Sequence, residues 1–288
     1  MVGVEYVNMV GWSPIFGCTK VSSGCDHCAE RLVKLTQHPW VKKHHVEVID
    51  GDGDWTGEVV FMSESLDIPF NIEPPALFNV GHISDMFHPG VTDDYRAAIF
   101  GVMAKLPRHH FVVTTRRIQA AKEWLADENT PASVAVQADR WADPSWDSFT
   151  KEWPLPNVTF AVSVEDQEHA DAMIPVLMDS LADRRLVRCS PMMGAIDLAA
   201  WPELDWVSVT APIQDKTVLP VAWVKAVADF CNENAIPLTF RGWGSGFPEM
   251  MTAEHRVAAV GRKISAAQMP GRACRMVGGN LRNDWPGF

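Results

Sequence analysis

The hydrophobic and polar positions of this 288-residue chain alternate between short apolar runs and longer segments with helical spacing. The apolar runs have the length and the content of branched and aromatic residues that are typical of buried strands. The predicted strands are Glu58–Met62, Leu77–His82, His110–Thr115, Val158–Val164, Leu186–Cys189, Trp206–Val209 and Pro237–Phe240. The predicted helices between them are Asp93–Leu106, Gln119–Ala126, Glu168–Leu181 and Val221–Asn234. This alternation predicts an α/β fold with mainly parallel strands, as a partial or complete (β/α) barrel.

The length of the chain and its 47% hydrophobic content allow one large core, and we predict a single domain over residues 1–288. Residues 127–156 are rich in Trp, Pro and Asp and are interpreted as an insertion or a lid. The net charge of −11 argues against non-specific binding to nucleic acid or anionic membranes, although it leaves room for a local basic groove.

The expected location is the cytoplasm, with no membrane partner. No apolar run approaches the ~20 residues of a membrane span, and Met1–Glu5 lack the basic start of a secretory signal. Cys189, Cys231 and Cys274 are scattered singly and do not indicate a disulfide framework.

The loop over residues 17–30 holds Cys18, Cys25 and Cys28 in the spacing C-x6-C-x2-C. Three thiols on one loop indicate a metal or cluster site. Structural zinc usually takes four closed ligands, and this loop offers one C-x2-C pair and one further cysteine. The pattern therefore favours a [4Fe-4S] cluster with one iron left open, which can bind S-adenosylmethionine. Zinc, or three unrelated buried thiols, are the alternatives.

The same region carries a resemblance to a known family. Residues 12–31 read W-S-P-I-F-G-C-T-K-V-S-S-G-C-D-H-C-A-E-R. This resembles the segment W-N-P-x-x-G-C-T-K-V-S-x-G-C-x-x-C-Y-A-E-R of a phage-rich, under-characterised family of three-cysteine-motif proteins that look like radical S-adenosylmethionine enzymes. Only the asparagine and the tyrosine are missing, and further blocks recur along most of the chain. The resemblance implies a [4Fe-4S] cluster, S-adenosylmethionine, an external electron donor, and the cytoplasm of a bacterial host if the protein is phage-encoded.

Polar residues follow the strand predicted at 77–82. Ser84-Asp85-Met86-Phe87-His88 is similar to the family's M-S-D-L-F-H block. Asp85 and His88, three residues apart, can share a helical face and are predicted to act as a catalytic pair that transfers protons or orients the substrate. The alternative is that Ser84 or Asp85 caps the following turn.

Two cations follow the next predicted strand. Arg116 and Arg117 stand where the family has L-T-K-R, and such a pair can hold a carboxylate or a phosphate. We predict that they bind substrate. A solvated basic turn is the alternative.

Three polar residues in the second half are predicted to bind the cofactor. Ser163 and Glu165 lie in a block that resembles the family's P-N-V-W-L-G-V-S-V-E, and Ser190 stands where the family has a glutamate. Arg241 and Trp243 replace the family's F-K-Q-W-G with F-R-G-W-G and are predicted to bind substrate. The tryptophan ring is able to stack on a base, or it belongs to a packed turn.

These residues predict a radical enzyme that reductively cleaves S-adenosylmethionine, so that a 5′-deoxyadenosyl radical removes hydrogen from a bound substrate. The resemblance to radical enzymes that act on nucleic acids, and the phage association of the family it resembles, favour modification or repair of a nucleotide or a nucleic-acid base. Two alternatives stay open. One is a zinc-stabilised nucleic-acid-binding protein without catalysis, and the other is a degenerate cluster protein that acts with a partner.

Overall fold

The computed structural model of the chain describes residues 9–28, 48–141, 152–212 and 217–245, and the backbone of short strands at 276–277 and 280–281. The chain divides into two compact units. Unit 1 comprises residues 1–161 and 176–184, together with residue 288, and unit 2 comprises residues 162–175 and 185–287. Within the described ranges, no helix is long and apolar enough to cross a lipid bilayer.

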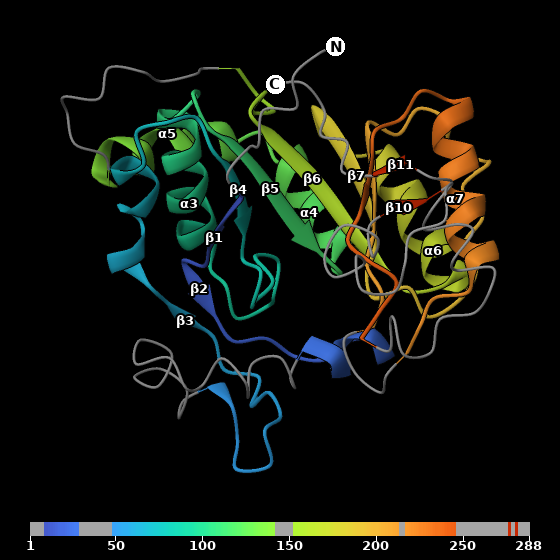
Figure 1. Ribbon diagram of the computed structural model, residues 1–288. Coiled ribbons are helices and arrows are strands. Elements are labelled where there is room, and N and C mark those ends of the chain that lie inside the picture. The colour runs from blue at the N-terminus through green and yellow to red at the C-terminus, as the bar shows by residue number, and fades with distance from the viewer. Residues whose placement is uncertain are drawn as a thin grey trace. The chain divides into compact units, whose positions relative to one another are not determined.

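Seven strands form the main sheet, which Figure 1 labels. Their hydrogen-bonded order is β1 (Met9–Trp12), β4 (Leu77–Val80), β5 (His110–Thr115), β6 (Val158–Val164), β7 (Arg184–Cys189), β8 (Trp206–Val209) and β9 (Leu238–Phe240). The pairs β1–β4, β4–β5, β7–β8 and β8–β9 are all parallel. Because β1 and β9 end the order, this sheet is open, and the predicted α/β fold is confirmed in the form of a partial barrel.

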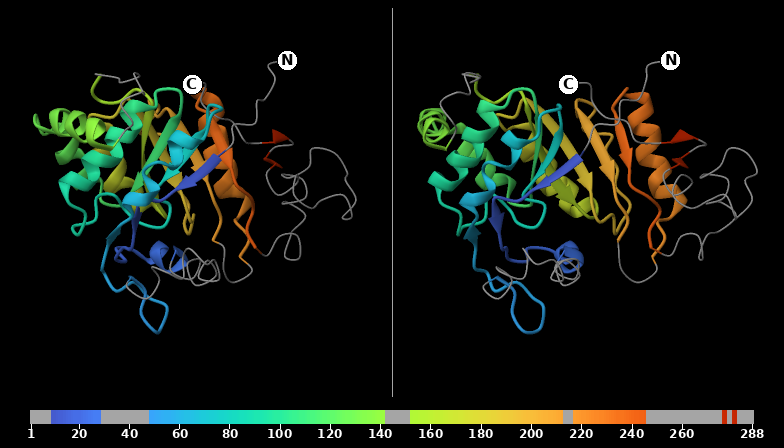
Figure 2. Two further views of the ribbon diagram at one scale, coloured as in Figure 1. Left: turned by 90° about the vertical axis from the view of Figure 1, so that its left-hand side faces the viewer. Right: turned by 60° about the vertical axis from the view of Figure 1, so that its left-hand side comes forward.

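The helices of unit 1 are α3 (Asp93–Lys105), α4 (Ile118–Ala126) and α5 (Thr130–Trp141). Helix α3 begins where Thr92 accepts a hydrogen bond from the backbone N–H of Tyr95, a cap that satisfies a free donor of the first turn. Helices α3 and α5 lie side by side (Figure 2). Their backbones approach so closely that a Cβ added at Gly101 would lie 2.7 Å from the backbone nitrogen of Ala138. Helix α5 comes from the segment interpreted as an insertion or a lid, whose residues 142–151 lie outside the described ranges.

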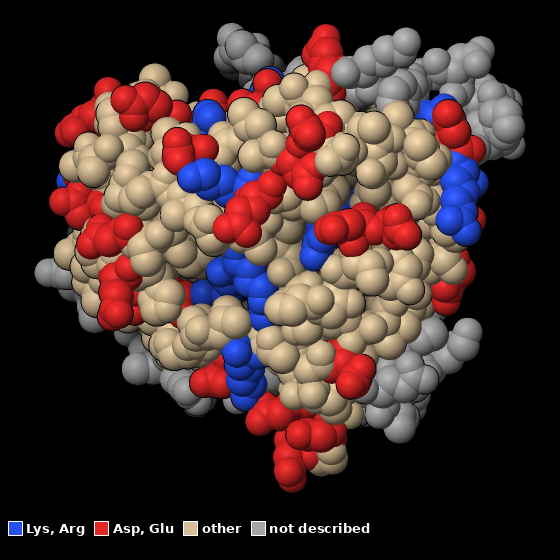
Figure 3. Space-filling view, turned by 180° about the vertical axis from the view of Figure 1, so that it is seen from behind, with Lys and Arg blue, Asp and Glu red and all other residues tan. Residues whose placement is uncertain are grey.

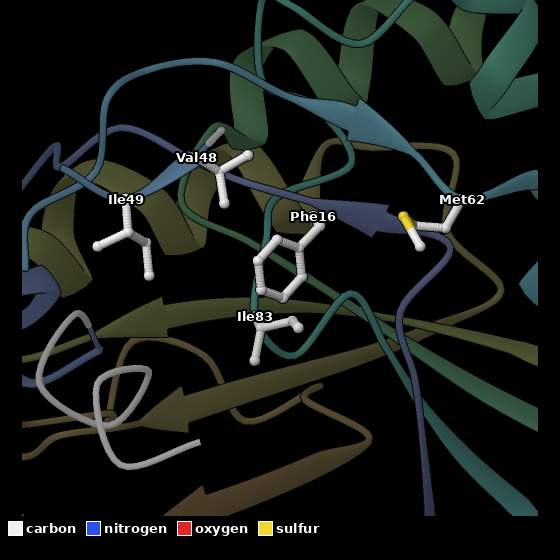
Figure 4. Close-up of a cluster of buried hydrophobic side chains, with 5 residues drawn as sticks. All are labelled: Phe16, Val48, Ile49, Met62 and Ile83. Atoms are coloured by element: carbon white, nitrogen blue, oxygen red, sulfur yellow. The ribbon is translucent and has the colours of Figure 1, made fainter. Parts of the chain in front are cut away.

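A second, smaller sheet has one strand before the cysteine loop and one after it in the sequence. β2 (Ile15–Phe16) pairs antiparallel with β3 (Val60–Phe61), so the strand predicted at 58–62 is shorter and belongs to this sheet. Phe16 packs in a buried cluster with four other apolar side chains (Figure 4): Val48, Ile49, Met62 and Ile83. This cluster holds the chain immediately before the first cysteine.

Unit 2 contains the end of β6, most of β7, and β8 and β9, with the start of α6 (Gln167–Met178) and all of α7 (Val221–Glu233). The thiol of Cys189 on β7 is fully buried near that of Cys231 on α7. Burial and the neighbouring Cys231 raise the pKa of Cys189 to about 12. Cys189 is therefore a protonated core side chain at neutral pH, and Cys231 is a fully buried core side chain beside it.

Acidic side chains are spread over the face seen in Figure 3, and Lys and Arg form smaller groups among them. This agrees with the net charge of −11.

Candidate functional site

The cysteine loop meets the carboxyl ends of β4 and β5 within unit 1. Gly17, directly before Cys18, forms an isolated parallel bridge with Ser84, which follows β4. Gly17 has a φ of 103°, and a Cβ there would lie 2.1 Å from the carbonyl oxygen of Glu58. A side chain is therefore excluded at this position both by backbone conformation and by space. The glycine lets the loop pass beside the residues that follow β4.

Asp85 is buried at the centre of this region, with 5% of its surface exposed. Its Oδ1 accepts hydrogen bonds from the backbone N–H of Phe87 at 2.9 Å and from the Thr115 hydroxyl at 2.7 Å. Its Oδ2 accepts from the backbone N–H of Arg116 at 3.1 Å and from Nη1 of Arg117 at 3.0 Å. The contact with Phe87 is the local turn cap that the sequence offered as an alternative, and the other three contacts join the ends of β4 and β5.

Arg117 connects Asp85 to the cysteine loop. Its Nη1 also lies 3.7 Å from the Cys18 sulfur, and its Nη2 donates to the carbonyl oxygen and the hydroxyl of Thr19 at 3.1 and 2.6 Å. Burial by itself lowers the pKa of Arg117, but the Asp85 carboxylate and the Cys18 sulfur raise it above its usual value. The guanidinium therefore stays charged while it holds three neighbours that are distant in sequence.

His88 also contacts the cysteine loop. Its Nδ1 accepts from the backbone N–H of Gly90 at 3.0 Å, which leaves the proton on Nε2 in the neutral ring. Nε2 then donates to the Thr19 hydroxyl at 3.1 Å. Burial and the Arg117 charge lower the pKa of His88, while Asp85 opposes the shift. A neutral His88 thus orients Thr19 at physiological pH.

The three sulfurs have different surroundings. Burial and Asp85 raise the pKa of Cys18, and Arg117 opposes this. Cys25 is buried in a 3₁₀ helix (Ser23–Cys25), where its sulfur accepts from the backbone N–H of Val21 at 3.5 Å and lies 3.7 Å from the Ser22 hydroxyl. Cys28 lies in a helical stretch, 26–28, and is partly exposed.

No three His, Cys, Asp or Glu side chains in the described part of the chain are gathered as a metal site. The donor set nevertheless fits cluster ligation in its chemistry. It has three thiols on one loop, and N–H donors point at the sulfurs of Cys18 and Cys25. Arg116 also contacts the cysteine loop, because its Nη1 donates to the Ser22 hydroxyl at 3.0 Å.

The residues predicted to bind the cofactor lie in unit 2. The Ser163 hydroxyl donates to the carbonyl oxygen of Ser190 at 2.7 Å, which brings two of the three together. Glu165 is fully buried, and its Oε1 lies 3.5 Å from Nε2 of His169. His169 also contacts Asp166 through Nδ1 at 2.7 Å. The sequence held a signal for His169, since residues i and i+4 meet on a helix.

The predicted substrate residues are placed differently from one another. Arg116 and Arg117 contact the cysteine loop and Asp85, so in this structure they position the loop. Arg241 is exposed. Trp243 is fully buried and packs edge-on against Phe240, with ring centroids 5.0 Å apart. Its ring is therefore a packed core side chain, the alternative to base stacking, because a base cannot reach a ring that has no exposed surface.

Comparison with known proteins identifies the family. A family model described as "Protein of unknown function (DUF5131)" matches residues 2–274. The chain belongs to the DUF5131 family. No curated protein and no solved structure matches it significantly.

Two residues of this DUF5131 chain that take part in the contacts of the candidate site in unit 1 escaped the sequence reasoning. The Thr19 hydroxyl accepts hydrogen bonds from both Arg117 and His88, and the Thr115 hydroxyl donates one to Asp85. Thr19 follows a motif cysteine directly, which was the available signal. Thr115 carried none, because a threonine in a buried strand is also a common strand former.

Proposed function

We propose that Cys18, Cys25 and Cys28 hold a [4Fe-4S] cluster, and that this DUF5131 chain is an S-adenosylmethionine-dependent radical enzyme. One observation carries the proposal: Arg117 contacts Asp85, Cys18 and Thr19 together, which fixes the cysteine loop to the carboxyl ends of two parallel strands. These strand ends are where barrel-type sheets place their active sites. A four-iron cluster with an open iron supplies the electron for reductive cleavage of S-adenosylmethionine.

The chain's own residues have distinct tasks in this proposal. Arg117 places a positive charge beside Cys18 and favours its thiolate, which is the form that binds metal. Asp85 holds Arg117 in place through the ion pair at 3.0 Å. Neutral His88 keeps the Thr19 hydroxyl turned toward the guanidinium. Asp85 and His88 are therefore proposed as positioning residues, which refines their predicted catalytic roles.

We propose a nucleotide or a nucleic-acid base as the substrate, and an external electron donor as the redox partner. The resemblance to radical enzymes that act on nucleic acids supports this choice, as does the exposed cation Arg241 in an acidic chain. Because Trp243 is buried, base stacking on its ring does not support the choice of substrate.

Metal analysis after anaerobic purification tests the cluster. Iron and sulfide should be present, with a brown visible spectrum, and each of Cys18→Ala, Cys25→Ala and Cys28→Ala should abolish iron loading. Cys231→Ala, which removes a buried thiol outside the loop, is the matched control and should load normally. Full iron and sulfide in any single loop variant would contradict the ligand assignment.

Two further outcomes separate the alternatives. A colourless protein that contains zinc would support the zinc-stabilised nucleic-acid-binding protein. A brown protein that forms no 5′-deoxyadenosine after reduction with S-adenosylmethionine would support the degenerate cluster protein.

A further inference from the structure

The segment 85–91, between β4 and α3, carries two of the side chains that hold the cysteine loop. Asp85 accepts from Arg117, and His88 contacts the Thr19 hydroxyl. The backbone of this segment forms two short turns, in which the N–H of His88 donates to the carbonyl oxygen of Asp85 at 3.0 Å and the N–H of Val91 to that of His88 at 2.9 Å. Turns of this kind have no ladder of hydrogen bonds to hold them, so neighbouring side chains fix their shape.

Arg96, in the first turn of α3, connects the two ends of this segment. Its Nε donates to the carbonyl oxygen of Met86 at 2.9 Å, and its Nη2 donates to that of Val91 at 2.7 Å. Met86 follows Asp85 directly, and Val91 lies three residues after His88. The two carbonyl groups that Arg96 holds therefore stand on either side of His88 in the chain.

The place of Arg96 within its helix is unfavourable by itself. A cation in the first turn lies at the positive end of the helix dipole. Nη1 of Arg96 pairs with Asp93 in the same turn, the side chain is only 12% exposed, and the guanidinium lies 5.7 Å from the centroid of the Phe87 ring. A residue that breaks a local rule while it keeps such contacts indicates a role outside its own helix.

These contacts require an arginine. A guanidinium offers five N–H donors in a fixed plane, so one side chain can hold two carbonyl oxygens and a carboxylate together. A lysine has one nitrogen and cannot reproduce that fork. Burial lowers the pKa of Arg96, and the Asp93 and Asp85 carboxylates oppose this shift. The charge of Arg96 therefore also acts on Asp85, the residue that accepts from Arg117.

We propose that Arg96 is a positioning residue for Cys18. It fixes the segment 85–91 and thereby places Asp85 and His88, which hold the cysteine loop through Arg117 and Thr19. That Cys18 binds a cluster rests on the proposed function. The position of the Cys18 thiol does not, so the metal-free protein can be used for the test.

Alkylation by iodoacetamide, resolved for each cysteine by peptide mass spectrometry, tests this in the reduced, metal-free protein. Cys18 is partly buried, so local opening of the loop speeds its reaction. Arg96→Gln removes two charge-assisted hydrogen bonds, and the alkylation rate of Cys18 should rise roughly fivefold or more. The fully buried Cys231 should stay unmodified over the same time, which shows that the variant remains folded. Arg140→Gln is the matched control, because Arg140 is an exposed arginine of unit 1 whose guanidinium also lies over a ring, 5.5 Å from the centroid of Trp141.

Arg96→Lys keeps the charge but loses the fork, so it should also speed the reaction of Cys18, and it carries the test if Arg96→Gln does not fold. Three outcomes would overturn the proposal: Cys18 reacts at the wild-type rate in the folded Arg96 variants, Arg140→Gln speeds its reaction equally, or Cys18 gains reactivity only together with Cys231.

Iron content of the anaerobically purified wild-type protein keeps the two proposals apart. Absence of iron together with a selective effect of the Arg96 variants on Cys18 would reject the cluster alone. A brown protein whose Arg96 variants leave Cys18 unchanged would reject the positioning role alone.

Discussion

We expect the ion pair between Asp85 and Arg117 to be the main contact that holds the cysteine loop against the carboxyl ends of β4 and β5. Their side chains are 6% and 13% exposed, so each charge depends on the other for compensation. In Asp85→Asn the amide has one oxygen, whereas the carboxylate accepts two donors on each oxygen. Whichever way the amide turns, its NH₂ group faces two donors that lose their acceptor. We expect Asp85→Asn to lower the free energy of unfolding by about 3 kcal/mol.

A double-mutant cycle measures the coupling energy between Asp85 and Arg117. Arg117→Gln should cost about 3 kcal/mol by itself, because it leaves the Asp85 carboxylate buried without its cation. Together the two substitutions should cost about 4 kcal/mol, a coupling of about 2 kcal/mol. Lys122, a partly exposed cation of the same unit that pairs with the exposed Asp179, offers the control. Asp85→Asn combined with Lys122→Gln should be additive within about 0.5 kcal/mol.

The assay is urea unfolding of the metal-free protein, followed by circular dichroism and by tryptophan fluorescence. Coincident transitions of the two probes justify comparing free energies. A coupling below about 0.5 kcal/mol for the Asp85 and Arg117 substitutions would refute the reasoning, because a buried pair with these contacts cannot act as two independent residues. A coupled pair whose variants still load iron fully would keep the ion pair and reject its role in positioning Cys18.

Two further predictions concern the frame of unit 1. His110 is 5% exposed, and burial followed by the Arg184 charge lowers its pKa to about 3. The stability that neutral His110 contributes is complete above the unfolded pKa near 6.5 and is lost as the pH falls toward 3. About 2 kcal/mol of this stability should be lost by pH 5. In urea titrations from pH 7.5 to 5, His110→Gln should therefore show a flatter dependence of stability on pH. Gly101→Ala should lower the free energy of unfolding by about 1–2 kcal/mol despite the better helix propensity of alanine, since the new Cβ would lie 2.7 Å from the backbone nitrogen of Ala138.

The controls for these two differ in kind. A His110→Gln protein that loses as much stability between pH 7.5 and 5 as wild type would show that other groups set the acid sensitivity. Gly51→Ala, where an added Cβ meets nothing within 4 Å, should change stability by less than about 0.5 kcal/mol. Equal effects of the two glycine substitutions would contradict the close approach of α3 and α5.

The sequence by itself determined the elements whose side chains repeat with a clear period. Strands β5, β6 and β8 have the predicted bounds, and the helices end within three residues of their predicted ends, because hydrophobic periodicity is a local property. Strand β1 was missed, since its four residues, M-V-G-W, are too few to show a period. Helix α5 was missed because a run rich in Trp, Pro and Asp surrounds it, and its packing on α3 depends on a glycine in a different helix.

The cysteine spacing likewise belongs to the sequence, but the partners of the loop belong to the tertiary structure. Arg117 and Cys18 are 99 residues apart, and only the parallel pairing of β4 and β5 brings the residues after these strands to one edge. The surroundings of Arg116, Arg117 and Trp243 were likewise decided by the tertiary structure. Whether a guanidinium faces a ligand or a buried carboxylate, and whether a ring is exposed or covered, depends on which distant segments fill the space around it. Local spacing carries no information about those segments, so the chemistry of the side chains could be predicted from the sequence and their partners could not.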